Sequence, residues 1–349
     1  MNILIQMEEY KMRIAIDAFG GDNAPLEVIK GSRRAADELG VDIILVGDEE
    51  KIKSVSSENN ISLEKIEIKH TTEVFDIHDD STLIIKEKKN TSMAVGLKML
   101  ADGESDAFVS AGSTGALVVG STFIAKRLKG IKRAALAPIL PSQNGFYMLL
   151  DAGANVDCRP DMLVQFAIMG SCYAEKILGI KNPRVGLINV GAEETKGREL
   201  ELSTYKLLEE APINFKGNAE ARDVPLGEFD VVVADGFTGN VFLKSVEGMG
   251  AFFSNSLKDM LMKNGKPTIP AIMLNKKIKI FKKKIDYKEQ GGAVLMGISK
   301  PVIKAHGSSD AKAFFNAIRQ AKLCVEQKVI ESISESLEIL ENKSKTEQV

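Results

Sequence analysis

The feature that most constrains the fold is a series of short glycine-rich turns, each standing between an apolar run and a helix-like pattern. These turns are residues 17–23 (DAFGGDN), 110–115 (SAGSTG), 189–197 (NVGAEETKG), 235–240 (DGFTGN) and 305–310 (AHGSSD). Each would place backbone N–H groups, small hydroxyls and a helix N-terminus at one edge of a sheet, an arrangement that binds anions. Their repetition predicts a cleft for phosphate or a phosphorylated substrate.

Short runs rich in β-branched residues alternate with helical patterns. Strands are expected at 13–17, 42–47, 66–70, 107–110, 184–190, 213–217 and 230–235, and helices near 25–39, 91–101, 114–127, 161–178, 198–210 and 238–263. Runs such as 231–234 (VVVA) are apolar on consecutive residues, which is typical of parallel strands covered on both faces. The sequence therefore predicts an α/β fold with a doubly wound, mostly parallel, Rossmann-like sheet, whose ligands gather at the carboxyl ends of the strands.

Residues 134–150 interrupt this alternation. Two apolar runs flank the turn-like segment PSQN at 141–144, which predicts an antiparallel hairpin in a small inserted subdomain. The remainder of 12–340 is expected to form a single α/β catalytic domain. Residues 1–11, which precede a second methionine, are expected to be a flexible extension, and 341–349 a frayed polar tail.

Composition narrows the class of protein. Apolar residues make up 44% of the 349 residues and charged residues 27%, as in globular proteins, and the net charge of −2 gives no case for nucleic-acid binding. The three cysteines form no CxxC pair, and the three histidines have no metal-ligand spacing, so neither a disulfide framework nor a metal site is expected. No apolar run is long enough to span a bilayer, and a cytoplasmic location is predicted.

Nucleotide-binding and covalent-catalysis motifs are missing from these turns. The chain has no GxGxxG, GxxxxGK[ST] or GxSxG pattern at the expected places. The turns at 17–23 and 110–115 suit either a phosphate pocket or simple helix starts, and Asp17 at a strand end is expected to face the crevice. For His306, a structural role in the loop and a role in lining the site are about equally favoured.

Two later turns point more strongly to chemistry. Lys196 would supply a point charge for phosphate or for a developing oxyanion. The alternative is that it only pairs with a glutamate on a solvated loop. At 235–240, Thr238 is expected to cap the following helix. Asn240, in its first turn, could direct an amide donor at a substrate carbonyl.

Together these segments resemble the PlsX-type phosphate acyltransferases of bacterial phospholipid synthesis. The resemblance runs from about residue 13 to 329 and rests on 16–22 (IDAFGGD), 110–116 (SAGSTGA), 151–155 (DAGAN), 189–194 (NVGAEE) with 196–197 (KG), 217–223 (GNAEARD), 235–241 (DGFTGNV) and 301–309 (PVIKAHGSS). One glycine turn would be weak support, but the whole set in order is specific. The extra residues at the two ends of the chain depart from the family without touching a motif.

The resemblance implies a fold similar to phosphate acetyltransferases and isocitrate-type dehydrogenases, a homodimer, and no metal or nucleotide cofactor. It implies attack of inorganic phosphate on the thioester of an acyl group carried by acyl carrier protein (ACP), which gives acyl phosphate. The expected catalytic residues are Lys196 and Asn240. The residues expected to bind phosphate or substrate are Asp17, Gly20, Gly21, Asn23, Ser113, Thr114, Gly115, Asn189, Glu193, Thr238 and His306.

Residues 271–288 carry a separate signal. Leu274, Ile278, Phe281 and Ile285 form one helical stripe, and six lysines stand around it. Such a basic amphipathic helix can lie on an anionic membrane, dock an acidic carrier protein or pack in a dimer. The resemblance favours peripheral membrane contact, because acyl phosphate would pass to a membrane glycerol-3-phosphate acyltransferase.

Three other functions remain open at this stage. The nearest is a phosphate acetyl- or butyryltransferase that uses a coenzyme A thioester. A nicotinamide-dependent decarboxylating dehydrogenase would need metal-binding aspartates and an arginine cluster that the sequence does not display. A non-enzymatic binding protein is disfavoured by the concentration of polar groups at successive strand ends.

Overall fold

The computed structural model describes residues 11–263, 266–267, 273–274, 276–278 and 291–346. The expected extension at 1–11 lies almost wholly outside the described residues, and so does most of the amphipathic segment 271–288. Contacts divide the chain into two compact units, residues 1–126 with 300–326 and residues 127–299 with 327–349. Whether these units fold together as the one domain expected over 12–340 stays a prediction.

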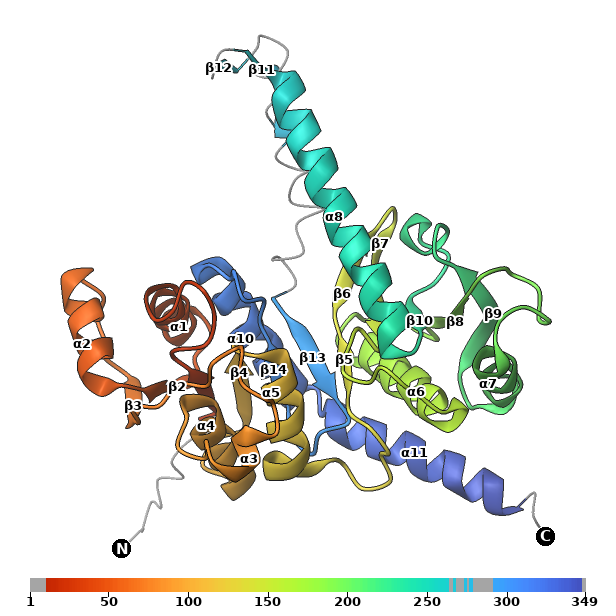
Figure 1. The fold of residues 1–349 in the computed structure, drawn as a ribbon, viewed down its shortest axis with the longest axis horizontal. Coiled ribbons are helices and arrows are strands. Elements are labelled where there is room, and N and C mark those ends of the chain that lie inside the picture. The colour runs from red at the N-terminus through yellow and green to blue at the C-terminus, as the bar shows by residue number, and fades with distance from the viewer. Residues whose placement is uncertain (1–10, 264–265, 268–272, 275, 279–290, 347–349) are drawn as a thin grey trace, which may run out of the picture. The chain divides into compact units, whose positions relative to one another are not determined.

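The first unit is built on a parallel sheet (Figure 1). Its strands are β1 (Arg13–Asp17), β2 (Asp42–Gly47), β3 (Ile66–His70), β4 (Ala107–Ser110) and β14 (Val302–Lys304), in the order β3-β2-β1-β4-β14. The inner strands are buried along their length because helices cover both faces, as their consecutive apolar residues predict. The chain moves outward from β1 in one direction and resumes at β4 on its other side, which is a topological switch point.

The helices of the first unit are α1 (Leu26–Glu38), α2 (Glu49–Glu58), α3 (Leu83–Lys86), α4 (Ser92–Asp102), α5 (Thr114–Gly120) and α10 (Ala311–Glu326). Two of them, α1 and α4, lie where the sequence predicts them, whereas α2 and α3 were not predicted. Gly31 of α1 lets α10 approach closely, since a Cβ atom there would lie 2.6 Å from the Cβ of Phe314. The helix expected over 114–127 is α-helical only to Gly120 and continues as the π-helical turn Ser121–Lys126.

The second unit has a five-stranded sheet of its own. Its strands are β6 (Ile139–Ser142), β7 (Gly145–Leu150), β10 (Val231–Val233), β8 (Arg184–Asn189) and β9 (Asn214–Glu220), in that spatial order. The strands from β7 to β9 are parallel, and β6 joins β7 in the predicted antiparallel hairpin. The first apolar run of that hairpin is divided at Pro138, however, and β5 (Ala135–Ala137) pairs instead with β13 (Ala293–Met296).

Helices of the second unit are α6 (Pro160–Lys176), α7 (Glu199–Glu210), α8 (Gly236–Leu261) and α11 (Val329–Thr346), with a 3-10 turn at Val224–Leu226. Helix α6 is buried along most of its length, as an apolar helix under a sheet must be. The first turns of α8 pack against the core through Phe242 and Leu243, while its distal half extends past the sheet of its unit (Figure 1). A short ribbon of β11 (Met262–Lys263) and β12 (Lys266–Pro267) follows α8. Helix α11 reaches into the segment expected as a frayed tail.

Candidate functional site

In the first unit, three glycine-rich turns converge at the carboxyl ends of β1, β4 and β14. The N–H of Asp22 donates to the carbonyl of Gly307 at 2.8 Å, which joins the turn after β1 to the turn after β14. Gly21, at φ +97°, has no room for a side chain, because a Cβ atom would lie 2.9 Å from both the Cβ of Ala111 and that same carbonyl. These contacts bring the segments predicted at 17–23, 110–115 and 305–310 together.

Asp17 lies beneath these turns. Its side chain is 2% exposed and accepts hydrogen bonds from the hydroxyls of Ser92 at 2.6 Å and Ser110 at 2.7 Å. Burial raises the pKa of Asp17, an effect that the two serine hydroxyls, the N–H of Phe19 and the charge of Lys304 oppose. A carboxylate bound in this way organises the strand ends from below, whereas the sequence suggested that it faces the crevice.

The ammonium group of Lys304, at the end of β14, is also buried. It donates to the carbonyl of Ala111 at 3.2 Å and to the carbonyl of Ala305. Lys304 is paired in register with Ser110, so a positive charge lies within the same layer as Asp17. In the sequence, Lys304 is distinguished only as part of the motif at 301–309, and its burial could not be predicted from that motif.

The predicted phosphate-binding residues of this unit lie at a helix start or in hydrogen bonds between and within the turns. Ser113 caps α5 by accepting from the N–H of Ala116 at 3.4 Å, and Thr114 and Gly115 form the first turn of that helix. Asn23 donates to the carbonyl of Ser309 at 3.2 Å, so its amide ties two turns together. His306 contacts the Ser308 hydroxyl through Nδ1 at 2.9 Å, within its own turn.

In the second unit, the carboxyl ends of β7, β10 and β8 lie side by side. Asp151, directly after β7, is fully buried, and its carboxylate accepts hydrogen bonds from the backbone N–H groups of Leu136, Ala154 and Asn155 at 2.6–3.0 Å. Burial raises the pKa of this carboxyl, and these N–H donors oppose the rise. Asp151 therefore fixes the 151–155 turn and joins it to β5.

This turn contacts the beginning of α8. The N–H of Gly236 donates to the carbonyl of Asn155 at 2.8 Å, and a Cβ atom on Gly239 would lie 1.9 Å from the carbonyl oxygen of Asp151. The exposed side chain of Asn240 lies beside Gly153, with its Cγ 3.4 Å from the position of a Cβ atom there. Glycines are required at this contact because backbone meets backbone.

The cap of α8 differs from the one expected. Asp235 is the N-cap, since its carboxylate accepts from the N–H of Thr238 at 2.7 Å and from the Thr238 hydroxyl at 3.1 Å. The expectation that Thr238 is the cap was therefore wrong, because the helix begins two residues earlier than the pattern indicated. Asn240 consequently stands in the second turn of the helix.

Asn189 braces the turn that carries Lys196. Its amide donates to the carbonyl of Lys196 at 3.0 Å and its carbonyl oxygen accepts from the N–H of Val190 at 2.8 Å. The carbonyl of Glu193 accepts from the N–H of Lys196, so that part of the turn is closed on itself. Among the described residues, the exposed Lys196 ammonium has no hydrogen bond or ion pair, and its charge is therefore available to an anion.

Arg198 ties the lysine turn to α8. Its Nη2 donates to the Asp235 carboxylate at 2.5 Å, and its guanidinium also binds the buried Glu201. These two carboxylates raise the pKa of Arg198. The ion pair between Arg198 and Asp235 thus joins the segment that carries Lys196 to the helix that carries Asn240.

Sequence reasoning missed Asp151, Arg198 and Asp235 as site residues. Both aspartates follow an apolar run and have a glycine within the next two residues, Gly153 and Gly236, and that signal could have marked them. Within the described ranges, no group of three or more His, Cys, Asp or Glu side chains is placed to hold a metal ion. Of the helices described, none is both long enough and apolar enough to cross a bilayer.

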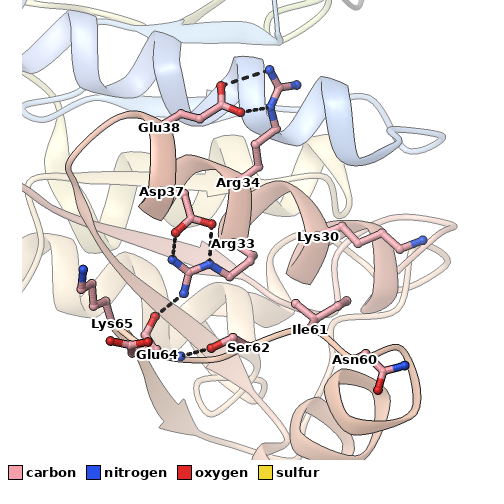
Figure 2. A pocket seen from close by; sticks show the side chains of 10 residues that line it. All are labelled: Lys30, Arg33, Arg34, Asp37, Glu38, Asn60, Ile61, Ser62, Glu64 and Lys65. Carbon is pink, nitrogen blue, oxygen red and sulfur yellow. Dashed lines mark hydrogen bonds and ion pairs between the residues drawn. The ribbon is translucent and has the colours of Figure 1, made fainter.

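One cavity of about 520 Å³ lies elsewhere in the first unit, between α1 and residues 60–65. Figure 2 shows that its guanidinium groups are already bound: Arg33 pairs with Asp37, and Arg34 pairs with Glu38. Because these cations are satisfied by carboxylates one helical turn away, the cavity is a salt-bridged groove and has little charge left for an anion.

Comparison with known proteins identifies relatives along most of the chain. Residues 12–332 match the model of a family described as "Fatty acid synthesis protein". The chain is 51% identical over 330 residues to a phosphate acyltransferase of Thermoanaerobacterium thermosaccharolyticum, covering 94% of this chain and 98% of that one. It is 49% identical over 329 residues to a phosphate acyltransferase of Caldanaerobacter subterraneus, with the same coverage.

Among solved structures, a phosphotransacetylase from Streptococcus pyogenes superposes with a TM-score of 0.59 over 94% of each chain, at 16% identity. This likeness confirms the predicted fold class, in which phosphate acetyltransferases were expected as neighbours.

Proposed function

Because this chain belongs to the phosphate acyltransferase family, we propose that it transfers a fatty acyl group from acyl-ACP to inorganic phosphate. The product would be an acyl phosphate for phospholipid synthesis by way of phosphatidic acid. The family membership itself makes the chain an acyltransferase that acts on phosphate. The fatty acyl donor and the carrier protein are the proposed part, and the family's description as a fatty acid synthesis protein supports them.

The observation that carries the proposal is the ion pair between Arg198 and Asp235, which joins the segment of Lys196 to the helix of Asn240. Among the described residues, the lysine offers an unpaired ammonium and the asparagine offers an exposed amide. An anionic nucleophile and a developing oxyanion are the two charges that acyl transfer to phosphate must accommodate. The reaction therefore needs a cation and a hydrogen-bond donor, and Lys196 and Asn240 would supply them.

In the proposed reaction, a phosphate oxygen attacks the thioester carbonyl carbon. The second pKa of phosphate is about 6–7, near that of phosphoserine, so the dianion is abundant at neutral pH and needs little help from a base. The tetrahedral intermediate then collapses, the C–S bond breaks, and the carrier leaves as a thiolate that takes up a proton. Lys196 would neutralise phosphate or oxyanion charge, and Asn240 would donate to the carbonyl oxygen; an oxyanion donor of this kind is worth roughly 3–4 kcal/mol.

The other predicted residues are proposed to shape the phosphate pocket. In the first unit, Ser113, Thr114 and Gly115 would supply a helix start, and Gly20 and Gly21 would let the turns approach an anion closely. Asp17, Asn23 and His306 hold these turns in place. In the second unit, Asn189, Glu193 and Thr238 position the lysine turn and α8.

We also propose a homodimer, for which the distal half of α8 provides support. Met249, Phe252, Phe253 and Met260 are between 51% and 71% exposed in the chain taken alone. An apolar helix of this kind would be covered by a second copy or another apolar surface. Peripheral membrane contact through 271–288, a cytoplasmic location and delivery to a membrane glycerol-3-phosphate acyltransferase stay proposals.

The donor is tested by measuring phosphate-dependent release of the carrier thiol from palmitoyl-ACP, with acyl phosphate identified by mass spectrometry. We expect one thiol per acyl phosphate, without added metal or nucleotide. Turnover of acetyl- or butyryl-coenzyme A with none of palmitoyl-ACP would instead assign the chain to the coenzyme A-dependent reaction.

A further inference from the structure

A loop of the second unit carries an excess of positive charge that the proposed chemistry does not use. Residues 127–133 (RLKGIKR), here called the basic loop, contain Arg127, Lys129, Lys132 and Arg133 and no carboxylate. All four of these side chains are exposed. Because the net charge of the chain is −2, this local concentration of cations is a candidate binding surface.

The basic loop is held in one conformation by buried contacts. Ile131 is buried, and the N–H of Leu128 donates to the carbonyl of Gly297 at 3.0 Å. Gln165 of α6 accepts from the N–H of Lys132 at 2.9 Å and donates to the carbonyl of Gly130 at 2.8 Å. A surface fixed in this way loses little conformational entropy when a partner binds.

Most of the charge of the basic loop is not neutralised by the residues that the structure describes. Lys132 pairs with Asp161, and Arg159 lies 3.5 Å from the same carboxylate, so two cations share one anion. Lys129 and Arg133 have no carboxylate partner in the part of the chain that the structure describes. The loop and its surroundings therefore present a net positive surface.

This surface is directly connected to the candidate site. Arg133 is followed by Ala134, whose carbonyl accepts from the side-chain amide of Asn155 at 2.7 Å. Asn155 in turn accepts from the first N–H of α8, the helix that carries Asn240. The basic loop is thus linked, through Ala134 and Asn155, to the start of the helix that carries the proposed oxyanion donor.

We propose that the basic loop is the docking surface for an acidic face of the acyl carrier protein. This inference rests on the proposed function and names how its donor is recognised. Charge complementarity favours an acidic protein, because the four cations are the exposed side chains of the loop, whereas Ile131 is buried and Leu128 is half-buried. A loop that bound a membrane surface would need apolar side chains to insert.

The test replaces two unpaired cations and separates docking from chemistry. The variant Lys129→Glu/Arg133→Glu is compared with wild type for the dissociation constant of holo-ACP, measured by calorimetry without turnover. KM and kcat are then measured for palmitoyl-ACP and for palmitoyl-pantetheine, a thioester without the carrier protein. A matched control, Lys206→Glu/Lys216→Glu, makes the same charge change at exposed positions elsewhere in the second unit.

We expect the loop variant to weaken holo-ACP binding and raise KM for palmitoyl-ACP about tenfold or more at low ionic strength, with kcat within about twofold. Turnover of palmitoyl-pantetheine should be unchanged within about twofold, and added salt should reduce the difference. The charge-preserving variant Lys129→Arg/Arg133→Lys and the matched control should behave as wild type.

Unchanged holo-ACP binding in the loop variant would overturn the docking proposal, whether or not acyl phosphate is formed. Loss of binding to phosphatidylglycerol–phosphatidylcholine vesicles with holo-ACP binding intact would also overturn it and make the loop a membrane contact. Failure of the wild type to form acyl phosphate, with normal loop-dependent holo-ACP binding, would count against the proposed reaction and leave the docking surface standing.

Discussion

Replacing Asp151 with asparagine tests the framework beneath the candidate site in the second unit. The Asp151 carboxylate accepts five hydrogen bonds: three reach Oδ1 from the N–H groups of Leu136, Gly153 and Ala154, and two reach Oδ2 from the backbone and side chain of Asn155. Asparagine keeps the volume and one acceptor oxygen. It places an NH₂ group where the other oxygen received two donors.

The expected loss follows from these contacts. A hydrogen bond to a charged acceptor contributes about 1.5–3 kcal/mol, and two such bonds are removed. The loss is reduced because the Asn155 side chain also donates to the carbonyl of Ala134 at 2.7 Å. It is reduced further because a neutral amide is buried at less cost than the carboxylate, whose pKa burial raises. We therefore expect Asp151→Asn to lower the free energy of unfolding by about 2–4 kcal/mol.

The assay is equilibrium unfolding in urea, followed by circular dichroism, with Asp48→Asn as the control. Asp48 caps α2 in the first unit by accepting from the N–H of Lys51 at 3.2 Å, and asparagine caps helices about as well as aspartate, so the control should change stability by less than about 0.5 kcal/mol. Asp151→Asn should also lower kcat, because the 151–155 turn positions α8. A loss of stability no larger than that of the control would refute this reasoning.

Further predictions concern the same two units. Gly239→Ala should lower stability by about 1–3 kcal/mol and reduce kcat, because its Cβ atom would meet the Asp151 backbone at 1.9 Å; a thermal midpoint equal to wild type would contradict this. Because burial raises the folded-state pKa of Asp17 above 3.8, the stability of wild type relative to Asp17→Asn should be greatest below that pH. This stability difference should fall as the pH rises toward the folded-state pKa of Asp17. A stability difference that instead increases with pH, measured by urea unfolding, would contradict the prediction. Burial and nearby carboxylates raise the pKa of Cys158 to about 11, so iodoacetamide at pH 8 should modify it on the order of a hundredfold more slowly than an ordinary thiol, as mass spectrometry can follow; rapid labelling would disprove it.

Much of the fold could be predicted from sequence because its signals are local. The strands β1, β2 and β4 are apolar on consecutive residues and end at glycine-rich turns, and the structure places them where the pattern did. In a parallel sheet, the turns that follow the strands all lie at the same edge, so the location of the glycine-rich turns follows from the parallel arrangement alone. This explains why the segments that carry Lys196 and Asn240 could be singled out.

The rest depends on contacts between distant residues. Nothing in the local pattern says that Arg198 binds Asp235, 37 positions later, or that β5 leaves the hairpin to pair with β13. The cap of α8 was misplaced because aspartate and threonine are both favoured N-caps, and the backbone contact at Gly236 decides where the helix begins.

The most direct test of the account compares acyl phosphate formation from palmitoyl-ACP and phosphate by wild type, Lys196→Ala and Asn240→Ala. Lys206→Ala serves as a surface control, and circular dichroism checks folding. The account predicts that each site substitution lowers kcat by about a hundredfold or more, the scale of one lost oxyanion donor, while the control retains wild-type turnover. Folded site variants that form acyl phosphate at the wild-type rate would contradict it.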